Sequence, residues 1–182
     1  MRKFDRRDGE GSDMEVRVVR TNKVFKVHKG GKTASWSVLV VVGDHKGKVG
    51  VGLGKARGVP DAIRKGEEAA RRSLLVVPLV GGTIPHDVKA KMGASVVLLK
   101  PASPGTGVVA GGAVRAMLEV AGVQDVLAKA FGSRNAINCA AATIKCLVDL
   151  SIPEVAAAAR GKDVAELIPW LAKARGEAPA DA

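Results

Sequence analysis

The first half of the chain follows a pattern of apolar and polar positions that predicts three strands and a helix. Apolar, mostly β-branched residues recur over 16–27, and a second apolar run covers 36–42. A glycine-rich turn at 29–32 separates these strands, and a turn at 44–47 leads into a third strand. Pro60 suits the first turn of a helix. The expected buried face of that helix consists of Ile63, Gly66, Ala70 and Leu74.

The second half alternates strands with helices. Strands are predicted near 86–91, 95–100 and 124–131, and helices near 111–122 and 136–149. Such alternation indicates one layer of sheet against one layer of helices. The predicted fold class is therefore α+β, with a three-stranded sheet plus a helix followed by a two-layer α/β sandwich. The expected divisions are an N-terminal arm at 1–13, a first domain at 14–80 with 75–80 as its connection, the sandwich at 81–150, and a C-terminal helical extension and tail at 151–182.

The charge is unevenly distributed between these parts. The net charge is +11, and residues 1–77 hold 18 lysines and arginines against 9 acidic residues, whereas residues 78–182 hold 11 against 9. A basic half joined to a nearly neutral half predicts that the first domain binds a polyanion and that the second docks or supports it. A membrane surface is the competing anionic partner, but no lipidation signal or basic amphipathic anchor accompanies the charge.

Two cysteines and the N-terminus indicate the compartment. Cys139 and Cys146 lie seven residues apart on a predicted helix, which favours reduced thiols on one buried face over a disulfide or a metal site. The first 13 residues lack the apolar run of a signal peptide, and the apolar runs are shorter than a membrane span. We expect a cytosolic protein without a metal or cofactor.

A glycine recurs at every second position of the third predicted strand, at Gly50, Gly52 and Gly54, and Lys55 and Arg57 follow. Alternate residues share one face of a strand, so this face carries almost no side chains. We expect a second backbone, such as a phosphodiester chain, to approach it closely. The run superficially resembles a nucleotide-binding loop, but its glycine spacing differs and it lacks the hydroxyl residue that holds magnesium.

Cations recur at every third position of the first hairpin. They are Arg17, Arg20, Lys23, Lys26, Lys29 and Lys32, with only Glu15 opposing them. We expect an edge strand or arm that contacts phosphates, the alternative being a solvated edge protected by lysines. The predicted helix at 60–74 carries further cations among acidic residues, where an ordinary solvated face is at least as plausible. Aromatic residues make up 3% of the chain, which favours recognition of structured RNA by shape over stacking of splayed bases.

The loop at 101–110 invites an enzymatic interpretation. Its spacing of Gly105, Gly107 and Ala110 is similar to a dinucleotide fingerprint, but a proline-broken loop replaces the tight strand-to-helix turn. It also resembles the phosphate loop of galactokinase-type kinases, with Val108 and Val109 where those enzymes have hydroxyl residues. We interpret it as a helix start that favours anions, without catalysis. The three histidines lie in predicted loops without metal-ligand partners.

Arg115 lies one turn inside the helix that follows this loop. A cation near a helix N-terminus is disfavoured by the helix dipole. We therefore expect an external acidic partner for Arg115, the alternative being a solvated surface arginine.

Many short motifs, in collinear order over roughly 16–168, resemble the bacterial small-subunit ribosomal protein S5 family. They include Lys29-Gly30-Gly31-Lys32, Gly54-Lys55-Ala56-Arg57, Leu99-Lys100-Pro101-Ala102, Ala110-Gly111-Gly112-Ala113-Val114-Arg115, Ala128-Lys129-Ala130-Phe131-Gly132-Ser133 and Arg160-Gly161-Lys162. Each is weak alone, and the set is specific. Trp36 departs from the family's usual Phe or Tyr, Lys32 and Lys48 stand where arginine is usual, and Gly58 stands where glutamate is commoner.

The resemblance implies a structural constituent of the small ribosomal subunit. Its first domain would be similar to the double-stranded-RNA-binding fold and its second to the kinase-like two-layer fold. Such a protein binds ribosomal RNA, steadies the subunit head against the body, touches proteins S4 and S8, and influences decoding accuracy with S4 and S12. The loop at 29–32 would lie near the spectinomycin site, and the residues around Lys23 near the messenger RNA entry channel. We expect neither a membrane role nor homo-oligomers, and a location in cytoplasmic ribosomes.

The patterns and the resemblance together predict the contact residues. The expected RNA contacts are Arg20, Lys23, Lys26, Lys29, Gly30, Gly31, Lys32, Gly52, Gly54, Lys55, Arg57, Arg64, Arg71, Arg72, Lys129, Ser133 and Arg134. The expected protein interface comprises Gly107, Arg115, Arg160 and Lys162, with Gly107 and Arg115 toward S4. The alternatives are a small-molecule kinase of the related fold and a free regulator that binds double-stranded RNA.

Overall fold

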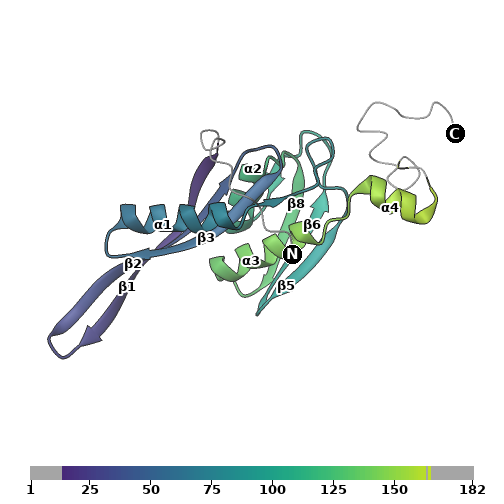
Figure 1. The fold of residues 1–182 in the computed structure, drawn as a ribbon. Coiled ribbons are helices and arrows are strands. Elements are labelled where there is room, and N and C mark those ends of the chain that lie inside the picture. Colours follow the sequence, from purple (N-terminus) through teal and green to yellow (C-terminus); the bar gives the residue numbers. More distant parts are fainter. Residues whose placement is uncertain (1–13, 163, 165–182) are drawn as a thin grey trace.

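The computed structural model describes residues 14–162 and residue 164. The predicted N-terminal arm at 1–13, together with residues 163 and 165–182 of the predicted C-terminal extension and tail, lies outside the described residues. The chain is α+β, with an antiparallel sheet and a helix followed by a second unit of sheet and helices (Figure 1). This confirms the predicted fold class.

The first sheet has four strands in the order β1-β2-β3-β4, one more than predicted. The strands are β1 (Glu15–His28), β2 (Gly31–Gly43), β3 (Lys48–Ala56) and β4 (Leu75–Val76), and helix α1 (Val59–Arg72) follows β3. The segment predicted as a mere connection therefore supplies the edge strand β4, which pairs with β3 at Val49 and Lys48.

The turn between β2 and β3 forms because Asp44 caps it. The Asp44 carboxylate accepts hydrogen bonds from the backbone N–H groups of Lys46 at 2.8 Å and Lys48 at 2.9 Å. His45 and Gly47 both adopt positive φ in this turn. An aspartate that binds its own backbone two residues on is a common way to close such a turn.

The second unit is a four-stranded sheet with two helices against it. Its strands, in the order β5-β6-β8-β7, are β5 (Val88–Met92), β6 (Ser95–Pro101), β8 (Val126–Gly132) and β7 (Val108–Val109), and its helices are α2 (Gly112–Ala121) and α3 (Ala136–Val148). The short β7 lies in the loop region and runs parallel to β8. Helix α4 (Pro153–Arg160) follows α3 (Figure 1).

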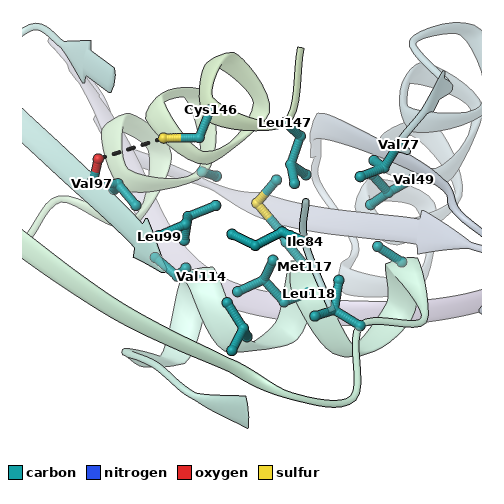
Figure 2. Packing of buried hydrophobic residues seen from close by; sticks show 14 of the residues in the cluster. Val49, Val77, Ile84, Val97, Leu99, Val114, Met117, Leu118, Cys146 and Leu147 are labelled. Carbon is teal, nitrogen blue, oxygen red and sulfur yellow. Dashed lines mark hydrogen bonds between the residues drawn. The ribbon is translucent and has the colours of Figure 1, made fainter. Parts of the chain in front are cut away.

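One continuous apolar core joins the two sheets. Met117 and Leu118 of α2 belong to the same buried cluster as Val49 of β3 and as Val97 and Leu99 of β6 (Figure 2). The N–H groups of His45 and Gly47 also donate to the carbonyl groups of Val120 and Ala121 at the end of α2, at 3.1 Å and 2.9 Å. The expected division at residue 80 thus crosses a shared core. Cys139 and Cys146 are free and buried, as predicted.

The glycine-bearing face of β3 packs against α1, so the expectation that it is open to a phosphodiester chain is wrong. A Cβ built on Gly52 or Gly54 would lie closer than 3.0 Å to backbone atoms of α1. The helix approaches this closely because it also has a glycine, Gly66, at the crossing. The three glycines pair with Val42, Val40 and Val38 of β2, which fill the space beside the helix. The prediction that another backbone approaches β3 closely is therefore correct, but that backbone belongs to helix α1 of the protein itself.

We expect Gly54→Ala to lower the free energy of unfolding by about 3 kcal/mol, the upper end for an overpacked core. The added methyl group would meet the carbonyl oxygen of Ala62 and, at 2.5 Å, the backbone nitrogen of Gly66. Backbone atoms cannot rotate away as a side chain can. Urea denaturation of the full chain measures the change.

Gly111→Ala is the matched control, because a Cβ at Gly111 meets nothing within 4 Å and the residue has a φ of −69°. We expect its denaturation midpoint to stay near that of the unsubstituted protein. Equal midpoints for the two variants would show that α1 does not pack as tightly on β3 as described.

Candidate nucleic-acid interface

The β1–β2 hairpin extends beyond the rest of its sheet as a two-stranded arm. The last residue pair that includes β3 is Trp36 with Ala56, whereas β1 and β2 stay paired as far as His28 and Gly31 (Figure 1). Residues 16–43 carry six lysines and arginines and no acidic residue. The arm is therefore a cationic projection, and β1 is an edge strand as predicted.

A β-bulge in β1 sorts these cations between the two faces of the arm. The register shifts between Val18 and Arg20. Arg20 and Lys26 consequently share the face of β2 that bears Leu39, and Lys55 of β3 lies on this same face beside Ser37. All three cations are exposed. We call Arg20, Lys26 and Lys55 the cationic face of the arm; it continues from the arm onto the adjoining end of the three-stranded part, where Arg20 lies opposite Leu39 and Lys55 opposite Ser37.

The opposite face of the arm gathers aromatic residues around one lysine. Lys23 pairs with Trp36 across the hairpin, and its ammonium group lies 5.8 Å from that ring and 5.4 Å from the ring of Phe25. Phe25 is 56% exposed. Sequence reasoning used only the low overall aromatic content and missed this cluster. The alternation that puts residues 23 and 25 on one face of β1 would have indicated it.

The tip of the arm is a two-residue turn at Lys29 and Gly30, and both residues are exposed. Gly31 has a φ of +141°, so a side chain there would be strained, whereas Gly30 has no positive φ. Next to the tip, Lys32 pairs with Val27 on the aromatic face. The predicted loop at 29–32 is thus exposed. Of its two glycines, only Gly31 adopts a backbone conformation that favours glycine.

The cations of α1 do not extend the cationic face. Helix α1 packs on the other side of the first sheet, against Val38 and Val40. Arg71 pairs with Glu67 at 2.8 Å, and Arg64 lies 3.7 Å from Asp61. These contacts suit the solvated-face alternative. Arg72 is exposed at the end of the helix, and Arg57 is exposed just before it.

The predicted RNA contacts of the second unit differ in their exposure and in how firmly the structure holds them. Lys129 is exposed on β8 and Arg134 is exposed in the loop that follows. Ser133 is tied into the structure, because its N–H donates to the carbonyl of Ala94 at 2.9 Å and its own carbonyl accepts from the Ser95 hydroxyl at 2.7 Å. The predicted RNA contacts therefore lie on several surfaces, and Gly52 and Gly54 are buried under α1.

The loop before α2 is held by a buried carboxylate. The N–H of Gly107 donates to Asp125 at 2.8 Å, and Gly107 adopts a φ of +74°. Asp125 is 8% exposed. Asp125 thus fixes the conformation of the loop. Arg160 and Lys162, the other predicted protein contacts, are exposed at the end of α4 and just beyond it.

Arg115 has a partner within its own helix, so the argument that it requires an external acidic partner is wrong. Its Nε donates to Glu119, one turn on, at 2.7 Å. Glu119 also accepts from Arg17 of β1. The i,i+4 spacing offsets the unfavourable dipole position of Arg115. Its side chain remains 59% exposed.

These contacts belong to an ion-pair cluster that joins the two units. Arg17 pairs with Glu15 at 2.8 Å, and the Glu15 carboxylate lies 2.6 Å from His45 Nε2. The hydrogen bond from Arg115, helped by that from Arg17, holds the pKa of Glu119 below its ordinary value against the opposing effect of burial. Hydrogen bonding to Arg17 likewise lowers the pKa of Glu15. We call Glu15, Arg17, His45, Arg115 and Glu119 the ion-pair cluster.

Within residues 14–162 and residue 164, no group of three or more histidine, cysteine, aspartate or glutamate side chains could hold a metal ion. In the same part of the chain no single helix is long and apolar enough to cross a membrane. Helices α3 and α4 are long and apolar enough for this only when they are taken together, and a bend of 46° separates them.

Two family models match the chain along the division between its sheets. The model "Ribosomal protein S5, N-terminal domain" matches residues 14–78, which contain β1 to β4 and α1. The model "Ribosomal protein S5, C-terminal domain" matches residues 90–160, which reach from β5 to the end of α4. The chain belongs to the ribosomal protein S5 family. It is a small-subunit ribosomal protein that binds ribosomal RNA, and the family is structural and non-enzymatic.

We expect Glu119→Gln to destabilise the protein at neutral pH but not in acid. A carboxylate whose folded pKa is depressed contributes stability above its ordinary pKa of 4.5, and this contribution is lost as the pH falls through the folded value. The difference in urea unfolding between Glu119→Gln and the unsubstituted chain should therefore shrink from about pH 7 to about pH 3.

Glu68→Gln is the control, since Glu68 is an exposed glutamate on α1 that forms no ion pair or side-chain hydrogen bond with the described residues. Its effect should be small throughout. A stability difference for Glu119→Gln that does not vary with pH would contradict the role assigned to the ion-pair cluster.

Proposed function

We propose that this S5-family protein steadies the head of a bacterial-type small subunit against the body, with the arm as its main RNA-binding element. The observation that carries this proposal is a cationic hairpin whose projecting part, past β3 and past the core, contains no acidic residue. An arm with no hydrophobic core of its own gains little stability within the protein. Contact with a polyanion would supply both its charge balance and its packing.

The two faces of the arm suit different parts of an RNA. The cationic face of Arg20, Lys26 and Lys55 fits phosphates, whose contacts give affinity without sequence preference. The aromatic face around Lys23 offers apolar surface for ribose or for unpaired bases. We assign the messenger RNA entry channel to the region around Lys23.

The remaining assignments concern neighbouring proteins. We propose that the loop and helix start from Gly107 to Arg115 contact protein S4, and that accuracy effects shared with S4 and S12 act through this region. Arg115 supports this assignment because its side chain is more than half exposed while its Nε is bound to Glu119. Arg160 and Lys162 are assigned to a protein interface, with S8 as the further partner.

Removing the three cations of the cationic face should weaken RNA binding and flatten its salt dependence. For Arg20→Ala/Lys26→Ala/Lys55→Ala in the full chain, the slope of log affinity against log salt should fall by about one for each lost phosphate contact. Filter binding or fluorescence anisotropy with a structured small-subunit RNA fragment measures both quantities. The full chain is required because the two sheets share a core.

Lys145→Ala is the matched control, because Lys145 is an exposed lysine of α3 in the second unit. It should leave the slope unchanged. An unchanged slope for the triple variant, with normal folding, would remove the arm from RNA binding.

We expect Gly30→Asp to raise tolerance to spectinomycin in cells while leaving the melting temperature nearly unchanged. Gly30 has no positive φ, and a Cβ there would come no closer than 3.8 Å to the ring of His28. Placement of the tip near the drug site follows from the family resemblance. Growth of strains that carry the variant as their sole copy, across a drug series, is the measurement.

Gln124→Asp places the same charge at an exposed residue of the second unit that belongs to none of the proposed contacts. It should leave drug tolerance unchanged. A destabilised Gly30→Asp protein with ordinary drug sensitivity would count against the proposed position of the tip.

A further inference from the structure

The second sheet leaves one of its faces uncovered by any described element. Helices α2 and α3 pack on the face that bears Val97 and Leu99 of β6 and Ala90 of β5. The register places the alternate residues of the four strands on the other face. These outward positions are Lys89 and Lys91 of β5, Val96, Leu98 and Lys100 of β6, Val109 of β7, and Leu127, Lys129 and Phe131 of β8.

This outward face, which we call the open face, combines cations with exposed apolar side chains. The strands β5 to β8 hold four lysines and no aspartate or glutamate, and all four lysines point outward. Leu127, Phe131 and Val109 are 42%, 46% and 53% exposed. A solvated face would not need this apolar surface, and its lysines have no acidic partners on the four strands.

The two central strands bring the two kinds of side chain together. Phe131 of β8 lies directly opposite Val96 of β6, and Lys129 lies opposite Leu98. Directly opposed residues on one face of a sheet have Cβ atoms about 4.5–5.5 Å apart. An occupant of the open face must therefore offer flat apolar groups and negative charges in close alternation.

We propose that the open face binds an unpaired stretch of RNA. Each unpaired nucleotide provides one base face and one phosphate, which match the alternation of apolar residues and lysines. A duplex would hide its bases and leave Phe131 and Leu127 without apolar partners. This proposal rests on the proposed function and adds a second RNA surface, of a different kind from the cationic face of the arm.

An acidic protein surface would satisfy the same charges. RNA is favoured because the lysines lie within the apolar surface, with Lys129 between Leu127 and Phe131 on β8, rather than only around its edge. Protein interfaces are usually depleted of lysine and keep their charges at the rim.

Binding of short oligonucleotides by the full chain tests the stacking contact. We expect Phe131→Ala to weaken binding of an oligouridylate by roughly tenfold, the order typical of one stacked base, and to have much less effect on an abasic strand of equal length. Lys129→Ala should weaken both strands. The controls are Val155→Ala, an exposed apolar residue of α4, and Lys145→Ala. Equal affinities of Phe131→Ala and the unsubstituted chain for oligouridylate would overturn the proposal.

Photo-crosslinking in assembled small subunits tests the occupant itself. A benzophenone amino acid at Leu127 should give an adduct that nuclease digestion removes, whereas an adduct that only protease removes would show a protein occupant and overturn the proposal. Absence of any adduct at Leu127, while the same probe at Lys29 reaches RNA, would also overturn it. An RNA adduct at Lys29 without one at Leu127 would contradict the proposal for the open face and leave the proposed function intact.

Discussion

The burial of α2 between two sheets is the contact on which the other features depend. Met117 and Leu118 share one apolar cluster with Val49 of the first sheet and with Leu99 of the second. The β2–β3 turn adds two backbone hydrogen bonds to the end of the same helix. Because buried apolar area is the main source of stability, separating the sheets would expose the largest part of the core. The arm and the open face are therefore held in a fixed relation to each other.

The same packing explains why the surfaces available for RNA lie at the periphery. Within the body, one face of the first sheet is covered by α1 and the other by α2. The inner face of the second sheet is covered by α2 and α3. What remains is the part of the hairpin beyond β3 with the adjoining end of the first sheet, where Arg20 and Lys55 are exposed, and the outer side of the second sheet. Neither the projecting part of the hairpin nor the four strands of the second sheet contain an acidic residue, so the cationic character is concentrated where the core ends.

Charge also links the two units, at the edge of their shared core. Glu119 accepts from Arg115 in its own helix and from Arg17 in the first sheet. Arg115 and Arg17 therefore share one carboxylate at the junction between the two units. Partly exposed pairs of this kind contribute modestly to stability, so their main effect is on geometry.

The order of strands and helices could be read from the sequence, because apolar periodicity and turn residues act locally. The hairpin, the Asp44 turn and the alternation of the second unit all appear at the predicted places. The glycines at 50, 52 and 54 likewise predicted a close backbone approach, but their partner is α1, since a strand's face does not reveal what covers it. The bulge near Val18 depends on strand register. The Glu119 partner of Arg115 lies at the local i,i+4 spacing and could have been predicted, whereas the contact of Glu119 with Arg17 depends on the tertiary fold. The sequence by itself determined the uneven charge that predicts a polyanionic partner. Only the tertiary structure decided which cations share a face, because that depends on the pairing of residues far apart in the chain.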